Sequence, residues 1–307
     1  MGKKASTSKA MSNEERAARL TRLRRRRALL TMTLALGICV FLYPIAARMY
    51  NQYRFVKLAE SYTQTMMDEP DEAKEAMWSA ARAYNVGHRV NNIEDPFGDG
   101  PESDASVQYA SLLDPMGNGL MGYLDIPRIE QRLNIYHGTD EDALLEGVGH
   151  LEGTSLPVGG DSTHCVLSAH RGLPAAKLFT DLDQLREGDV VYLRVLDRTL
   201  AYRVDGSEVV EPSDIDSLAI AEGQDLLTLV TCTPYAINTH RLLVRAHAVA
   251  YHPEEDQTVN IGLLVRARLA LVCAGVAVSA TIAFMAAGRL AVRVSPDELS
   301  PRARHLS

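Results

Sequence analysis

Two long apolar runs bracket the chain, and they constrain its fold more than any other feature. Residues 28–47 form twenty consecutive positions without a charged side chain, and residues 269–287 form nineteen. Each run is long enough for one helical crossing of a membrane. The alternative for the first run is a signal peptide, but it is longer than a usual apolar signal region and begins far into the chain. We therefore expect two membrane-spanning helices.

Basic residues set the expected orientation. Residues 1–27 carry ten Lys or Arg and two Glu, and such flanks stay in the cytoplasm. The second run has arginines on both sides, so its own flanks do not decide its direction. Two crossings return the chain to its starting side. Both termini, including a tail at 288–307, are therefore expected in the cytoplasm, and the segment between the runs is expected outside the cell.

The central part of the chain is strongly acidic. Residues 28–265 hold 35 Asp or Glu and 16 Lys or Arg, a net charge of −19, whereas the whole chain has −7. This balance argues against nucleic acid as a partner, because phosphate backbones favour basic patches. The basic head is suited to the anionic lipid of the inner leaflet, so the cell membrane is the expected contact.

The external segment divides into three parts. Residues 48–90 predict helices, because apolar residues recur at three- and four-residue spacing. Residues 91–119 are rich in Gly, Pro, Asp, Asn and Ser and predict a long loop, of the kind that often acts as a lid. Residues 120–255 contain short runs of β-branched residues separated by turn signals, which predict an antiparallel sheet or a closed barrel. One short helix is expected within this part, at residues 175–185.

The chain has four cysteines. Cys39 and Cys273 fall inside the apolar runs, where they are small apolar fillers. Only Cys165 and Cys232 remain in the external segment, so a disulfide scaffold is not expected, although one bridge between them is an alternative. Strand alternation places Cys165 on an entirely apolar face, which predicts an inert core position.

Cys232 ends a run of β-formers in the stretch TLVTCTPY, residues 228–235. Because Cys232 lies near the end of a predicted strand, it is either a small buried apolar residue or a nucleophile that a substrate can reach at the edge of the sheet. A hairpin over the following turn would bring Cys232 beside Arg241, for which the alternative is a solvated surface side chain. Thiol catalysis needs a neighbouring His or cation, a proton donor and a group that stabilises an oxyanion. Spacing alone does not choose among the nine histidines.

Metal-binding patterns are weak in this sequence. It has no CxxC pair, and His164 and His170 would stand ~20 Å apart along one strand at ~3.3 Å per residue. A zinc site is therefore not expected. No cofactor of any kind is predicted.

Two longer stretches resemble a known family. TLVTCTPYAINTHRLLVRA, residues 228–246, resembles the active-site hairpin of sortases, which are membrane-anchored cysteine transpeptidases of Gram-positive bacteria. Residues 147–174 resemble the strand and loop that carry the family histidine. The resemblance implies a mainly β fold, an eight-stranded sortase barrel. It also implies that Cys232 is the nucleophile, His170 the general acid and base, and Arg241 the group that stabilises the oxyanion and substrate.

The tripeptide Asp95-Pro96-Phe97 resembles the lid of class C sortases, which build pili. In that class the lid acid contacts the active-site arginine and an aromatic ring, often Trp where this chain has Phe97, covers the cysteine. The alternative for this tripeptide is an ordinary turn. A second membrane span after the barrel, at 269–287, is also similar to class C.

Class C resemblance implies a substrate and a reaction. The partners would be pilin or surface proteins with LPXTG-like sorting signals, and a pilin lysine would resolve the thioester into an isopeptide bond. One alternative is a housekeeping sortase that joins surface proteins to a peptidoglycan precursor. Another is a non-catalytic membrane scaffold with a sortase-like barrel.

Overall fold

The computed structural model describes residues 13–87, 105–214, 216–256 and 261–292. The chain falls into two compact units, residues 1–47 and 48–307. The predicted lid residues Asp95, Pro96 and Phe97 lie outside the described residues.

The first unit contains the N-terminal part of a 56-residue helix, α1 (Asn13–Asp68), which includes Pro44. Over the described part of the chain, one helical stretch is long and apolar enough to cross a membrane. It is Leu29–Asp68, and its most apolar window has a mean hydropathy of 2.1. The run at 269–287 lies within helix α5 (Ile261–Val292), and its role as a second span stays a prediction.

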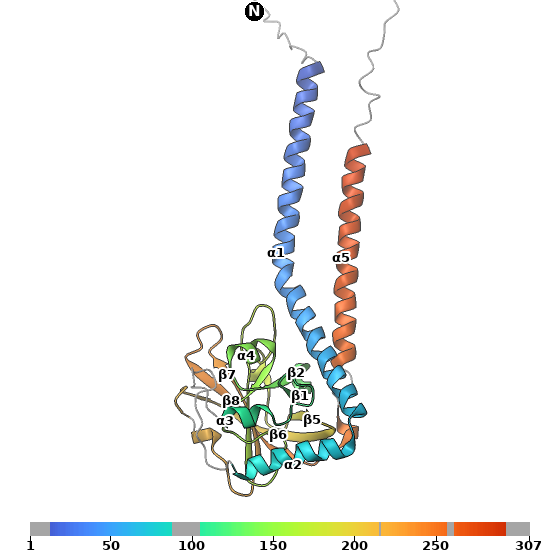
Figure 1. Cartoon of the computed structure of the whole chain (residues 1–307). Helices are drawn as coiled ribbons and strands as arrows, with labels where there is room; N and C mark the ends of the chain where they lie inside the picture. Colours follow the sequence, from blue (N-terminus) through green and yellow to red (C-terminus); the bar gives the residue numbers. More distant parts are fainter. Residues whose placement is uncertain (1–12, 88–104, 215, 257–260, 293–307) are drawn as a thin grey trace, which may run out of the picture. The chain divides into compact units, whose positions relative to one another are not determined.

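A closed eight-stranded barrel lies at the centre of the second unit (Figure 1). The strands are β1 (Leu120–Ile126), β2 (Gln131–His137), β3 (Val148–His150), β4 (Thr163–Ser168), β5 (Val190–Val195), β6 (Arg198–Val210), β7 (Asp225–Thr233) and β8 (His240–Val249). Their order around the barrel is β1-β2-β3-β4-β7-β8-β6-β5. The predicted mainly β fold and eight-stranded barrel are confirmed.

The barrel is a mixed sheet. β2 pairs with β3 and β4 pairs with β7 in parallel, and the other neighbouring strands are antiparallel. The parallel β4–β7 pair joins segments that are about 60 residues apart in the sequence. The register of this pair decides which residues lie opposite each other where β4 and β7 end, at the rim of the barrel.

Alternation along the strands separates two apolar clusters. The inner cluster fills the barrel and includes Cys165, Leu229 and Val244. A smaller cluster lies on the other face of β4, β7 and β8. Its members are Leu151, Val166, Leu218, Val230 and Leu243. The same strands therefore have an apolar lumen side and an outer side that is partly covered by short connecting segments.

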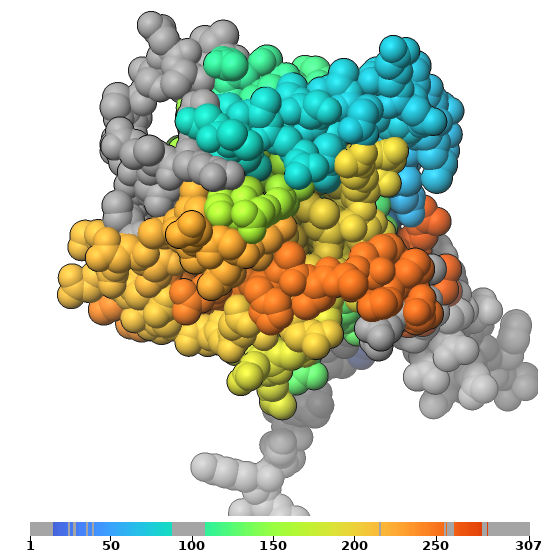
Figure 2. All heavy atoms as spheres, turned by 90° about the horizontal axis from the view of Figure 1, so that it is seen from below, coloured from blue at the N-terminus to red at the C-terminus, as the bar shows by residue number. Residues whose placement is uncertain are grey.

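Helices and short 3₁₀ turns surround the barrel. The remaining elements of this unit are α2 (Asp71–Gly87), α3 (Ala105–Ala110), α4 (Glu141–Glu146), η1 (Pro127–Ile129), η2 (Leu182–Gln184), η3 (Asp216–Leu218) and η4 (Pro253–Glu255). Figure 2 shows α2 (cyan) beside β5 and β6 (yellow) on one face. The guanidinium of Arg198 lies over the Trp78 ring, 4.4 Å from its centroid, and this contact attaches α2 to β6.

The helix predicted over residues 175–185 is wrong. This segment forms turns and ends in η2. The N–H of Thr180 donates to the carbonyl of Lys177 at 2.8 Å, which is an i to i+3 bond of the 3₁₀ type. Leu178 has a φ of +40°, and a left-handed residue interrupts a right-handed helix.

Candidate active site

The β7–β8 hairpin brings Cys232 and Arg241 together. The two strands are antiparallel, and the Cα of Cys232 pairs with that of Arg241. Cys232 shares the face of Val230, and Arg241 shares the face of Leu243, because successive residues of a strand point to opposite sides. Val230 and Leu243 both belong to the outer cluster. The thiol and the guanidinium therefore lie on the outer face, at the end of β7.

The parallel β4–β7 pair places His170 at the same rim. Ser168 pairs with Val230, and the N–H of Ala169 donates to the carbonyl of Val230 at 3.2 Å. Continuing this register two residues beyond the end of β4 would bring His170 opposite Cys232, in keeping with the Arg171–Thr233 side-chain bond one residue further along. The three residues implied by the sortase resemblance are thus brought together: Cys232 lies between His170 on the β4 side and Arg241 on the β8 side.

Arg241 is held by the loop between β7 and β8. Its side chain is mostly buried, with only 8% of the residue exposed. Its Nη1 donates to the carbonyl of His240 at 3.3 Å and lies 3.5 Å from that of Asn238. The backbone at the end of this loop and the start of β8 therefore orients the guanidinium.

His170 is partly buried, and its surroundings act on its pKa in opposite directions. Burial lowers the pKa of His170, and the negative charge of Glu141 opposes that shift. Glu141 begins helix α4 and is exposed. Sequence reasoning did not single out Glu141, because only the fold brings this helix toward the β4 end.

The two cysteines of the barrel have different environments. Cys165 is buried in the inner cluster, and burial raises the pKa of its thiol well above the ordinary value. Cys232 is partly exposed, and both are free thiols. The inert position predicted for Cys165 agrees with this burial, because the thiolate is the reactive form of cysteine.

A glycine allows an aromatic ring to lie over the loop that follows His170. Gly172 has a φ of +82°, and a Cβ at this position would stand 3.0 Å from the ring of Tyr235. Tyr235 and Ile237 are 50% and 66% exposed in the β7–β8 loop. This rim therefore presents apolar side chains close to the thiol.

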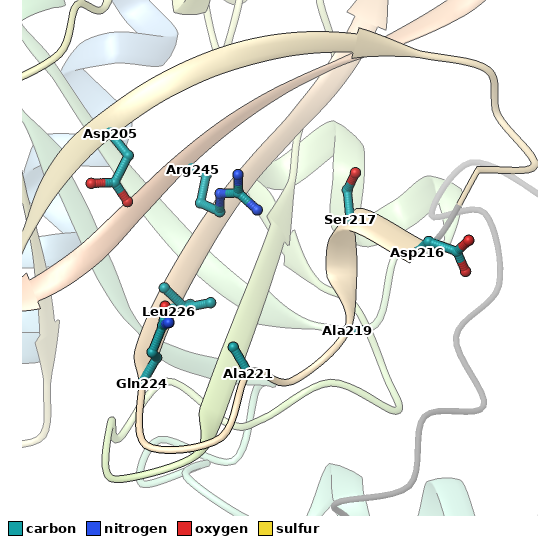
Figure 3. Close-up of a pocket in the computed structure, with 8 residues that line it drawn as sticks. All are labelled: Asp205, Asp216, Ser217, Ala219, Ala221, Gln224, Leu226 and Arg245. Carbon is teal, nitrogen blue, oxygen red and sulfur yellow. The ribbon is translucent and has the colours of Figure 1, made fainter.

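A separate pocket of about 400 Å³ opens on the outer face (Figure 3). Its lining residues are Asp205, Asp216, Ser217, Ala219, Ala221, Gln224, Leu226 and Arg245. Leu226 and Cys232 lie six residues apart on β7, ~20 Å at ~3.3 Å per residue. The pocket is therefore distinct from the rim that carries Cys232. Within the described ranges, no group of three or more His, Cys, Asp or Glu side chains could hold a metal ion.

Comparison with known proteins agrees with this geometry. The sortase domain family matches residues 124–249. The structure of Streptococcus pneumoniae sortase C is 42% identical, with 64% of this chain and 97% of that chain covered and a TM-score of 0.57. Sortase C-1 of Actinomyces oris is 45% identical, with coverage of 58% and 99% and a TM-score of 0.56.

The chain belongs to the sortase family. Its similarity to the solved sortase C structures supports class C within that family, as the sequence resemblance predicted. The family consists of cysteine transpeptidases that are associated with the membrane in Gram-positive bacteria.

Curated relatives match over a shorter part of this sortase. Sortase D of Bacillus subtilis is 29% identical over 134 residues, which cover 44% of this chain and 64% of that protein. Sortase A of Streptococcus agalactiae is 30% identical over 131 residues, with coverage of 41% and 52%. The matched region thus spans between about half and two thirds of these relatives.

Proposed function

We propose that this sortase cleaves LPXTG-like sorting signals and joins the product to a lysine of a pilin. The proposal is supported by the pairing of Cys232 with Arg241 and by the parallel β4–β7 register, which ends two residues before His170. The pilin as substrate is supported by the relative from Streptococcus pneumoniae, which is described in terms of pilin substrate specificity.

The first step is acylation of the enzyme. The sulfur of Cys232 attacks the threonine carbonyl carbon of the sorting signal, and a C–S bond forms. Arg241 donates N–H groups to the oxyanion that develops on the carbonyl oxygen. The imidazolium of His170 gives its proton to the threonine–glycine amide nitrogen as the C–N bond breaks. A thioester and a peptide with a free glycine amine result.

The second step resolves the thioester. The amine of a pilin lysine attacks the carbonyl carbon, and neutral His170 takes a proton from the attacking nitrogen. The C–S bond then breaks, the thiolate of Cys232 is released, and an isopeptide bond remains. The proton that His170 lost in the first step is regained in the second. Partial burial lowers the pKa of His170, which favours the neutral base that this step requires.

A trapped thioester tests this mechanism. We expect mass spectrometry of the full chain with an LPXTG peptide to show an adduct on Cys232, and Cys232→Ala to abolish cleavage. Cys165→Ala is the matched control, because this thiol lies in the barrel core. Cleavage that persists in folded Cys232→Ala contradicts the proposal. Transfer to a cell-wall stem peptide in place of a pilin lysine would instead favour the housekeeping reaction.

We further propose that Asp95 and Phe97 form a lid over Cys232. Replacing either residue by alanine should speed alkylation of the Cys232 thiol, because the covering groups are then lost. Asp99→Ala, in the same acidic segment, is the matched control. Equal labelling rates in all variants would contradict the lid.

We also propose that residues 28–47 and 269–287 both cross the membrane, with the barrel outside the cell. A cysteine introduced at position 307 should then be protected from a membrane-impermeant maleimide in intact cells, whereas Cys232 should react. Labelling of the introduced cysteine in intact cells would contradict the two-pass arrangement.

A further inference from the structure

Side-chain bonds connect the neighbours of His170 to the neighbours of Cys232. The hydroxyl of Thr231, the residue before the nucleophile, donates to the carbonyl of Ala169 at 2.7 Å. Ala169 directly precedes His170. This bond joins the residue before Cys232 to the residue before His170. Both Thr231 and Ala169 are fully buried.

Arg171 forms the corresponding bond on the other side. Its Nη1 donates to the hydroxyl of Thr233 at 3.1 Å, and Thr233 directly follows Cys232. Its Nη2 pairs with the carboxylate of Asp183 at 2.6 Å. The Arg171 side chain is only 9% exposed. The guanidinium thus connects three segments: the end of β4, the end of β7 and helix η2.

The loop that carries Arg171 is held at both of its flanks. The carbonyl of His170 accepts from the N–H of Phe179 at 3.2 Å. The N–H of Gly172 donates to the hydroxyl of Thr180 at 3.1 Å. These bonds hold Arg171 in a short, ordered segment directly beside His170.

One nitrogen of the Arg171 guanidinium has no hydrogen-bond partner among the described residues, which lowers the contribution of this side chain to the stability of the fold. Within the described part of the chain, its Nε is buried without a hydrogen-bond partner. A buried donor without a partner costs free energy, on the order of 1–3 kcal/mol. The bonds of Arg171 to Thr233 and Asp183 therefore connect these segments at some cost in free energy.

We infer that Arg171 is a positioning residue, which fixes the separation between the His170 imidazole and the Cys232 thiol through its bond to Thr233. Asp183 orients the guanidinium for that bond by a charge-assisted contact. The inference rests on the proposed function, in which His170 and Cys232 act on one substrate. Reacting groups that are misplaced by about 1 Å cost on the order of 100-fold in rate.

The test compares variants of the full chain in detergent, with an LPXTG peptide as the probe. Arg171→Ala and Thr233→Val should each lower kcat/KM by about 10- to 100-fold. The double variant should be no worse than the poorer single variant, because both changes remove the same bond. Arg171→Lys should recover part of the activity, since one ammonium replaces one of two contacts. Arg186→Ala, an exposed arginine two residues after η2, is the control and should keep wild-type activity.

A second readout separates positioning from a general structural role. The rate of Cys232 alkylation is measured against pH in each folded variant. We expect the pH profile of alkylation in Arg171→Ala and Thr233→Val to differ from that of the wild-type chain, because the separation between the Cys232 thiol and the His170 imidazole changes. If Arg171→Ala does not fold, Thr233→Val, which replaces one hydroxyl by a methyl group, decides the question.

Two results would overturn the inference. One is wild-type activity and a wild-type alkylation profile in folded Arg171→Ala or Thr233→Val. The other is a double variant whose loss equals the product of the single losses, which would show that the two side chains act independently. Failure of the proposed function looks different, because the wild-type chain itself would then form no thioester on Cys232.

Discussion

Tyr62 provides a quantitative test of how α1 is attached to the barrel. Its side chain is fully buried, with 1% exposed. Its hydroxyl donates to the carbonyl of Met121 in β1 at 2.9 Å and accepts from the N–H of Leu196, beyond β5, at 2.8 Å. Burial raises the pKa of Tyr62, so the hydroxyl stays protonated and can make both bonds.

Tyr62→Phe keeps the ring and removes both of these bonds. A buried carbonyl and a buried N–H then lose their partner, and each such loss costs about 1–3 kcal/mol. We therefore expect the free energy of unfolding to fall by roughly 2–6 kcal/mol from the two losses together. For a domain of this size each kcal/mol lowers the Tm by about 2–4 °C, so the Tm should fall by roughly 4–24 °C.

Tyr123→Phe is the matched control. The Tyr123 ring packs edge-on against that of Tyr62, with centroids 6.2 Å apart. Its hydroxyl makes a 3.1 Å bond to the side chain of Thr63, which also donates to a backbone carbonyl. Loss of this partly buried bond should cost only about 0.5–1.5 kcal/mol.

Thermal unfolding of the full chain in detergent measures both variants. The fluorescence of Trp78, the single tryptophan, reports on α2 where it packs against the barrel. A Tyr62→Phe variant that is no less stable than Tyr123→Phe would refute the reasoning. It would show that the two backbone groups find other partners or that α1 is not closed against the barrel.

Three further predictions concern titration and thiol chemistry. Cys232 should be alkylated in the folded protein. Cys165 should react more slowly by on the order of 1,000-fold or more, because its thiol becomes accessible only on global unfolding, at a cost of at least about 5 kcal/mol. Similar alkylation rates for the two cysteines would contradict the core position of Cys165. Burial lowers the pKa of His150 to about 4, while its ordinary value is 6.5. The unfolded chain therefore binds the additional proton, and stability should fall by about 3 kcal/mol as the pH drops from about 6.5 to 4; an unchanged pH slope in urea titrations of His150→Gln would contradict this. The negative charge of Glu141 raises the pKa of His170, so Glu141→Gln should lower that pKa further. The reaction needs the His170 imidazolium, and the basic limb of the kcat/KM profile should therefore move to lower pH. A move to higher pH would contradict the interaction between Glu141 and His170.

Some features of the fold were not readable from local pattern. Local pattern does not mark β2 and β3 as strands, since β3 has only three residues and β2 carries polar residues. The predicted helix at 175–185 failed because an amphipathic pattern does not reveal a left-handed residue such as Leu178. In both cases the conformation of a short segment depends on neighbouring strands and loops of the barrel, and the segment's own sequence does not identify these neighbours.

The sequence by itself determined the local geometry of this sortase. The period of two separates Cys165 from the rim, and the short span between Cys232 and Arg241 makes their pairing a property of one hairpin. These relations need only backbone alternation and a turn.

Only the tertiary structure decided how His170 and its neighbour Arg171 meet the nucleophile. Their contacts depend on the parallel β4–β7 pair, whose partners are 62 residues apart. The register of such a pair is fixed by closure of the whole barrel and by the burial of one face of every strand. No local pattern contains that information, because the free energy that selects the register comes from all eight strands together.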